Sequence, residues 1–124
     1  MNTMPIVAVS DIAATVAFYR ALGFEPHHQG PRWAELRRGQ AIIGLHTAPE
    51  LPPVEPARVH FSLIANERLE GVVARLQGAG VPLERGIGDE SFGRSILLRD
   101  LDGMPLQVNE YDLALFTPGD PGAR

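Results

Sequence analysis

The 124-residue chain contains no cysteine, no lysine and no long hydrophobic run. Because cysteine is absent, disulfides, thiolate metal ligands and a cysteine nucleophile are excluded. No apolar run approaches the roughly 18 residues of a membrane span, and residues 1–20 lack the basic and apolar segments of a signal peptide. We therefore expect a soluble cytoplasmic protein with no membrane partner.

Positive charge is scarce and scattered. All 11 basic residues are arginines, and 15 acidic residues give a formal net charge of -4. A surface that binds nucleic acid gathers basic side chains on one face, and the sequence shows no such cluster. We expect no nucleic-acid partner. The acidic excess favours a cationic ligand only weakly, because salt screens it.

Two segments carry the signals of a short amphipathic helix. Asp11 can accept hydrogen bonds from the amides of a helix start, apolar residues follow at helical spacing, and Gly23 ends the pattern. In the second segment Asn66 is the expected cap, and an apolar stripe begins at Leu69 and ends before two glycines. The sequence thus predicts two helices.

The remaining apolar segments predict strands. Gly39–Gln40 separates the two arms of a first hairpin, and Asp102–Gly103 is a strong turn signal between the arms of a second. His27–His28 is interpreted as part of a solvated Gly/Pro turn. The predicted strands are 5–11, 33–39, 40–47, 59–65, 94–100 and 105–111.

These elements repeat along the chain. The two expected caps lie 66 − 11 = 55 residues apart, and a segment with four prolines in ten residues separates the copies. The sequence predicts an α+β fold of two βαβββ modules in a single domain, residues 1–116. Its parts are module one (1–47), a linker (48–57) and module two (58–116), followed by a flexible tail (117–124). A domain of this size gains stability from forming an oligomer.

Three stretches carry a family resemblance: VAVSDIAATVAFYRALGF, WAELRRGQAIIGLH and FGRSILLRDLDG. Over residues 4–111 the chain resembles the vicinal oxygen chelate superfamily, which includes glyoxalase I, extradiol dioxygenases and bleomycin resistance proteins. The bleomycin resistance branch is most similar, through Trp33 with Arg38–Gly39 and through Phe92–Gly93. The resemblance implies a cup-shaped mixed sheet and a homodimer with grooves at the subunit interface.

The resemblance also implies where a metal would be held. The four positions are Met4, Gly44, His60 and Gln107. A divalent metal needs two or more histidine or carboxylate ligands, and only His60 is a strong one. We therefore expect no metal and no other cofactor. A different ligand set, in which His46 and Glu35 join His60 and Gln107, stays open. No serine stands in a nucleophile-elbow context, so no catalytic residue is assigned.

The same resemblance suggests a ligand groove. Proteins that hold flat heteroaromatic molecules use aromatic faces and a few polar anchors. The candidate ligand-binding residues are Trp33, His46, His60, Phe92, Gln107 and Tyr111. Ordinary core packing is the alternative interpretation of Trp33 and Phe92.

Three functions follow from these patterns. The leading hypothesis is a non-catalytic protein of the bleomycin resistance type that sequesters an antibiotic or natural product, planar and cationic. The alternatives are a metal-dependent glyoxalase-like lyase, isomerase or dioxygenase, and a scaffold whose cup binds nothing.

Overall fold

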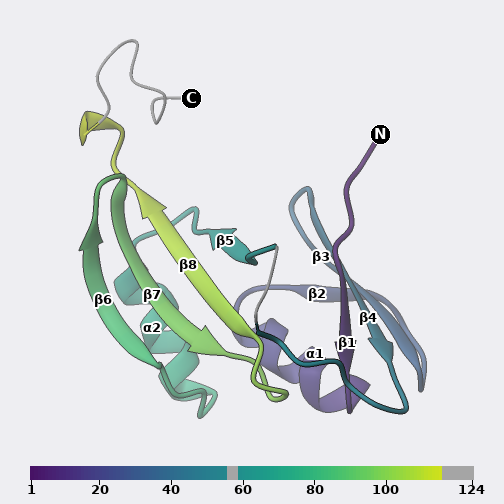
Figure 1. The fold of residues 1–124 in the computed structure, drawn as a ribbon. Helices are drawn as coiled ribbons and strands as arrows, with labels where there is room; N and C mark the ends of the chain where they lie inside the picture. Colours follow the sequence, from purple (N-terminus) through teal and green to yellow (C-terminus); the bar gives the residue numbers. More distant parts are fainter. Residues whose placement is uncertain (56–58, 116–124) are drawn as a thin grey trace. The chain divides into compact units, whose positions relative to one another are not determined.

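The computed structural model describes residues 1–55 and 59–115 and divides the chain into two compact units (Figure 1). Unit 1 comprises Met1–Pro56 with Asp100–Gly103, and unit 2 comprises Ala57–Arg99 with Met104–Arg124. Each unit contains a strand, a helix and three further strands. The predicted α+β fold of two βαβββ modules is confirmed. The assignment of residues 1–116 to a single domain stays a prediction.

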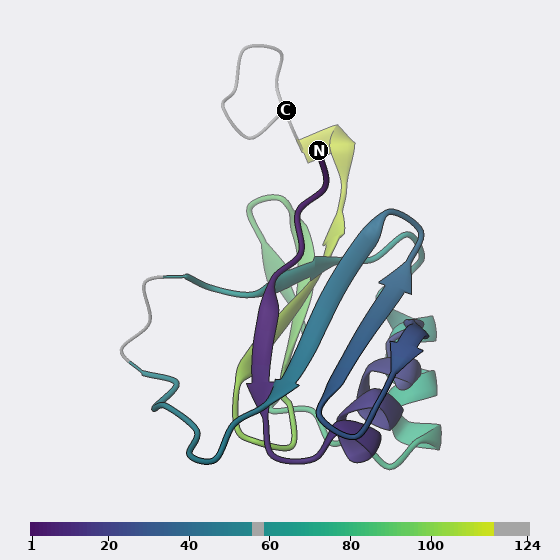
Figure 2. The same cartoon turned by 90° about the vertical axis from the view of Figure 1, so that its right-hand side faces the viewer.

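In unit 1 the four strands form one mixed sheet in the order β1-β4-β3-β2 (Figure 2). β1 runs parallel to β4, while β3 is antiparallel to both of its neighbours. The predicted hairpin about Gly39–Gln40 is confirmed. The elements are β1 (Ile6–Val9), α1 (Ile12–Ala21), β2 (Glu25–Gln29), β3 (Trp33–Arg38) and β4 (Ala41–Thr47).

Helix α1 begins and ends where the sequence predicts. The Asp11 carboxylate accepts a hydrogen bond from the amide of Ala14 at 2.9 Å, as an N-cap does. After the last turn, Gly23 adopts a φ of 95°, and the amides of Gly23 and Phe24 donate to the carbonyls of Arg20 and Tyr19. Because this conformation is strained for residues with a Cβ, glycine is the natural terminator.

The core of unit 1 lies between α1 and one face of the sheet. Strand residues such as Val9, Leu36 and Leu45 are fully buried there, together with Tyr19 from the helix. Burial, with a smaller contribution from the carboxyl of Asp100, raises the pKa of Tyr19.

Residues 100–103 connect β7 to β8 in the chain and belong to unit 1. The Asp102 carboxylate accepts hydrogen bonds from the Ser10 amide at 3.0 Å and the Ser10 hydroxyl at 2.6 Å. The Gly103 amide donates to the carbonyl of Asp100 at 3.0 Å, which closes the turn. The predicted Asp-Gly turn is therefore confirmed, and its aspartates serve as hydrogen-bond acceptors.

The prediction of a turn at His27–His28 is wrong, because both histidines lie in strand β2. β2 pairs with β3, and a bulge between Pro26 and His28 shifts its register. The strand is almost entirely exposed and polar, since it lies at the end of the sheet. Its hydrogen bonds to β3 define it as a strand.

Unit 2 repeats this plan with the sheet order β5-β8-β7-β6. β5 runs parallel to β8, and the other pairs are antiparallel. β6 was not among the predicted strands, and the expected strand 59–65 is reduced to three residues. The elements are β5 (Ser62–Ile64), α2 (Leu69–Gly78), β6 (Arg85–Glu90), β7 (Gly93–Arg99), β8 (Pro105–Tyr111) and the 3₁₀ turn η1 (Leu113–Leu115).

The start of α2 differs from the prediction. Asn66 does not cap it, since the N-cap position is Arg68, which makes no side-chain cap. Instead the Glu110 carboxylate, from β8, accepts a hydrogen bond from the Leu69 amide at 2.8 Å. A residue distant in sequence therefore replaces the local cap.

Arg94 joins this helix start to the sheet of unit 2. Its guanidinium donates two hydrogen bonds of 2.7 Å to Glu70 and bonds of 3.0 and 2.9 Å to Glu110. These hydrogen bonds lower the pKa of Glu70 to about 2 and also lower the pKa of Glu110.

In the described part of the predicted linker, residues 48–55 form no helix or strand. The rest of the linker, 56–57, and the predicted tail, 117–124, lie outside the described residues. No helix within the described ranges is long and apolar enough to cross a membrane.

Candidate functional site

The face of the unit 1 sheet that does not bury the core residues carries a distinct set of side chains. Strand alternation places Val7 and Val9 in the core and leaves Ile6 and Ala8 exposed. On β4, Gly44 is paired with Ile6 and His46 with Ala8. On β3, their partners are Glu35 and Trp33. We call Ile6, Ala8, Trp33, Glu35, Gly44 and His46 the open face of unit 1.

Trp33 and His46 are direct cross-strand partners on the open face. Their ring centroids lie 6.1 Å apart, and the ring planes meet at 63°, an edge-to-face arrangement. Trp33 is half-buried and His46 is exposed. The structure therefore brings together two of the predicted ligand-binding residues, and Trp33 is not a fully buried core residue.

Gly44 leaves the space that the indole occupies. A Cβ at this position would lie 2.7 Å from Cη2 of Trp33 and 3.3 Å from Cγ1 of Ile6. The indole thus extends from β3 over the Gly44 backbone towards β1. Any larger residue at position 44 would displace the ring.

Polar groups flank the indole. Nδ1 of His46 is hydrogen-bonded to the carbonyl oxygen of Thr47 at 2.6 Å. Glu35 accepts contacts of 2.8 Å from Nε and Nη2 of Arg37, both through Oε2. The Glu35 side chain is 17% exposed, so this pair is partly shielded from solvent.

In unit 2, Phe92 and Tyr111 form a second aromatic pair. Their ring centroids are 5.2 Å apart at 66°. Phe92 lies in the turn between β6 and β7, and its carbonyl accepts a hydrogen bond from the Asp112 amide at 2.9 Å. Tyr111 is the last residue of β8 and is 44% exposed. The two predicted residues are in contact with each other.

Gln107 also lies on β8, beside polar residues that the sequence analysis missed. Its amide nitrogen donates to Oδ1 of Asn109 at 2.7 Å. Asn109 pairs with Ser95 across the sheet, and both are buried. The Ser95 hydroxyl accepts from Arg85 at 2.6 Å and donates to Glu90 at 2.9 Å. The sequence did contain a signal for these residues, because Ser95 and Asn109 are polar residues within predicted strands, and a polar residue that becomes buried needs a hydrogen-bond partner.

His60 is not in a strand. It lies in an exposed segment before β5, although the sequence predicted a strand there. Within residues 1–55 and 59–115, no hydrogen bond or ring contact of its side chain supports a place in the ligand site. Its assignment rests on the resemblance alone.

The four positions at which the resemblance implies metal ligands do not form a fitting donor set. Met4 precedes β1 and His60 precedes β5. The indole of Trp33 lies against Gly44, and the side chain of Gln107 is hydrogen-bonded to Asn109. In the described parts of the chain, no three histidine or acidic side chains gather in a way that could hold a metal ion. These residues do not fit a divalent cation. The alternative set draws on both units and stays a hypothesis.

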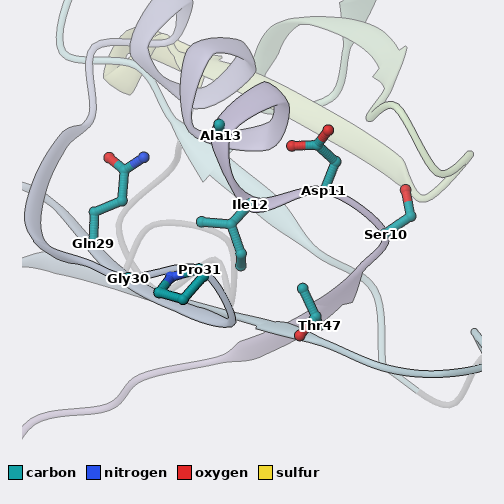
Figure 3. Close-up of a pocket in the computed structure, with 8 residues that line it drawn as sticks. All are labelled: Ser10, Asp11, Ile12, Ala13, Gln29, Gly30, Pro31 and Thr47. Carbon is teal, nitrogen blue, oxygen red and sulfur yellow. The ribbon is translucent and has the colours of Figure 1, made fainter.

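A separate hollow of about 620 Å³ lies at the start of α1 (Figure 3). Ile12 projects towards Pro31 and Thr47, and the Asp11 carboxylate is engaged in capping the helix. The lining contains no aromatic residue and none of the predicted site residues. It is formed by Ser10, Asp11, Ile12, Ala13, Gln29, Gly30, Pro31 and Thr47.

Comparison with known proteins places the sequence in a family. A model described as the Glyoxalase/Bleomycin resistance protein/Dioxygenase superfamily matches residues 3–108. No curated protein matches the chain.

Solved structures are similar over most of the chain. An antibiotic-binding protein from Streptomyces sp. CB03234 is 24% identical, with a TM-score of 0.74, and the match covers 90% of this chain and 96% of that one. The bleomycin resistance determinant of transposon Tn5 is 21% identical, with a TM-score of 0.69 and coverages of 90% and 98%. A lactoylglutathione lyase from Agrobacterium tumefaciens is 19% identical, with a TM-score of 0.68 and coverages of 89% and 92%. At these identities the likeness shows the fold alone.

Proposed function

Because the chain belongs to the Glyoxalase/Bleomycin resistance protein/Dioxygenase superfamily, we propose that it is a binding protein of the bleomycin resistance type. It captures a small organic molecule with a flat ring system and releases it unchanged. The antibiotic-binding protein from Streptomyces and the Tn5 determinant are structural precedents for this function on the same fold.

One observation carries the proposal: the indole of Trp33 lies so close to Gly44 that a Cβ there would be 2.7 Å from Cη2 of the ring. The half-buried ring lies against Gly44 and beside the imidazole of His46. An aromatic surface that is fixed before the ligand arrives loses little conformational freedom on binding. It also stacks with other flat rings, at about 0.5–1.5 kcal/mol beyond the area that it buries.

The other proposed ligand-binding residues supply a second surface and polar anchors. Phe92 is half-buried and pairs with the exposed Tyr111, and Gln107 and His46 carry polar groups. His60 is kept on the strength of the resemblance. We also propose that two chains associate as a homodimer, with the ligand grooves at the subunit interface.

The enzymatic alternative needs a metal that polarises a carbonyl or activates oxygen. The donor set at the four family positions does not fit such an ion, as described above. Capture requires no such ion, so the residues present favour binding over a glyoxalase-like or dioxygenase reaction.

The test is a calorimetric titration of the protein with bleomycin and a panel of planar heteroaromatic antibiotics. We expect saturable binding of at least one compound and quenching of the fluorescence of Trp33, the sole tryptophan. Replacing Trp33 with Leu should weaken binding by about 2- to 10-fold through loss of stacking. Trp33→Phe keeps an aromatic ring and should bind better than the leucine variant.

Mass spectrometry of the recovered compound separates capture from catalysis. The expected result is an unaltered compound after prolonged incubation. A chemically altered compound, or no heat and no quenching with any member of the panel, would contradict the proposed function.

A further inference from the structure

The hydrogen bond of His46 fixes which nitrogen of its ring carries the proton. Nδ1 lies 2.6 Å from the carbonyl oxygen of Thr47. A carbonyl oxygen can only accept, so Nδ1 must be the donor. In the neutral imidazole the other nitrogen, Nε2, then has a lone pair and can only accept a hydrogen bond.

The neighbours of His46 leave room for a ligand beside this acceptor. Its partner on β1 is Ala8, and its partner on β3 is Trp33. Ala8 is one of the smallest side chains, and His46 itself is exposed. A flat molecule on the indole therefore has its edge next to the imidazole, which stands at 63° to the indole plane.

A carboxylate on the open face is also an acceptor. Glu35 lies next to Trp33 on the open face, on the same strand. The guanidinium of Arg37 contacts Glu35 through Nε and Nη2, and both contacts are to Oε2. They use part of the hydrogen-bonding capacity of the guanidinium. Oε1 of Glu35 receives neither of them, so it adds a second acceptor near the indole.

We infer that the open face of unit 1 selects flat ligands that donate a hydrogen bond from the edge of the ring, with Nε2 of His46 as the acceptor. This inference rests on the proposed function and names the chemical class of its ligand. Ring hydroxyls and ring N–H groups satisfy it, whereas the corresponding O-methyl and N-methyl compounds do not. His46 is a specificity-determining residue in this arrangement, and Trp33 supplies the stacking surface.

The tautomer can be measured without any ligand. Long-range ¹H–¹⁵N spectra at about pH 8, where a histidine side chain is ordinarily neutral, distinguish a protonated ring nitrogen from one with a lone pair. We expect the His46 Nδ1 signal to be of the protonated type and the Nε2 signal of the lone-pair type. The opposite assignment would overturn the inference and leave the proposed function standing.

The ligand preference is tested by calorimetry with 2-naphthol and 2-methoxynaphthalene. Both are flat and uncharged, and they differ in one hydrogen-bond donor. We expect the hydroxyl compound to bind about 2- to 10-fold more tightly, the range for one neutral hydrogen bond. His46→Phe keeps an aromatic ring but removes the acceptor, so it should bind both compounds equally.

A matched control is His27→Phe, at an exposed position of β2 outside the open face. It should keep the preference of the unchanged protein. Equal binding of the two probes by the unchanged protein, or a preference that survives in His46→Phe, would refute the inference. If neither probe binds, the inference is overturned, and the titration with the antibiotic panel decides the proposed function separately.

Discussion

Replacing Gly44 with alanine tests whether the indole of Trp33 lies where the structure places it. The new methyl group would lie 2.7 Å from Cη2 of Trp33, inside van der Waals contact. Gly86 is the matched control, because it also lies in a strand, has no positive φ, and would place its Cβ where nothing lies within 4 Å. The two variants therefore differ in crowding and share the same chemical change.

The magnitude follows from two effects. Either replacement reduces the freedom of the unfolded chain, which stabilises the protein by about 0.4–1 kcal/mol. Crowding at Gly44 opposes this gain by about 1–3 kcal/mol, the usual cost of overpacking. We expect Gly86→Ala to be neutral or slightly stabilising and Gly44→Ala to be less stable than Gly86→Ala by about 1–3 kcal/mol.

Urea unfolding followed by circular dichroism measures this difference. With a denaturant dependence of about 2 kcal/mol per molar, the two midpoints should differ by ~1 M. The emission of Trp33 should also shift in Gly44→Ala and remain unchanged in Gly86→Ala. Equal midpoints and equal emission in the two variants would show that the indole does not lie over Gly44.

Three further predictions concern stability. Gly93 has a φ of 147°, and a Cβ there would meet the carbonyl oxygen of Glu110. Gly93→Ala should therefore strain the backbone and lower the free energy of unfolding by more than about 2 kcal/mol. A melting temperature close to that of the unchanged protein would contradict this backbone strain. The pKa of Glu70 is lowered from 4.5 to about 2 by Arg94, so the stability from this pair is present above about pH 4.5 and is lost as the pH falls towards 2. Urea midpoints measured across this window should fall less in Arg94→Met, and parallel curves would refute the linkage. Asp11→Ala removes the cap of α1 and should cost about 1 kcal/mol, measured by the same unfolding assay, whereas Asp11→Asn should retain most of it; equal loss in both variants would contradict a capping role.

The predictability of each element follows from how local its causes are. Helix α1 was predictable because its cap at Asp11, its apolar spacing and its terminator at Gly23 all lie within the segment. The start of α2 was not, since a carboxylate 41 residues away, that of Glu110, binds its first amide. Strand β2 was hidden because its polar sequence resembles a turn, and its conformation is determined by hydrogen bonds to β3.

The same distinction applies to the candidate site. Trp33 and His46 lie at equal distances along the chain from the two-residue turn at Gly39–Gln40, so a hairpin places them opposite each other. The role of Gly44 could not be read from the pattern, because it depends on the side-chain conformation of Trp33. The acceptor at His46 likewise depends on a single hydrogen bond to a carbonyl.

Strand β2 closes the sheet of unit 1 at one end, and its backbone is poorly suited to extending that sheet. Pro26 has no N–H to offer, and the bulge that follows it interrupts the regular spacing of donors and acceptors. An uninterrupted exposed edge is a template on which another chain can add a strand and begin a fibril. The proline and the bulge therefore disfavour the addition of a strand to this edge.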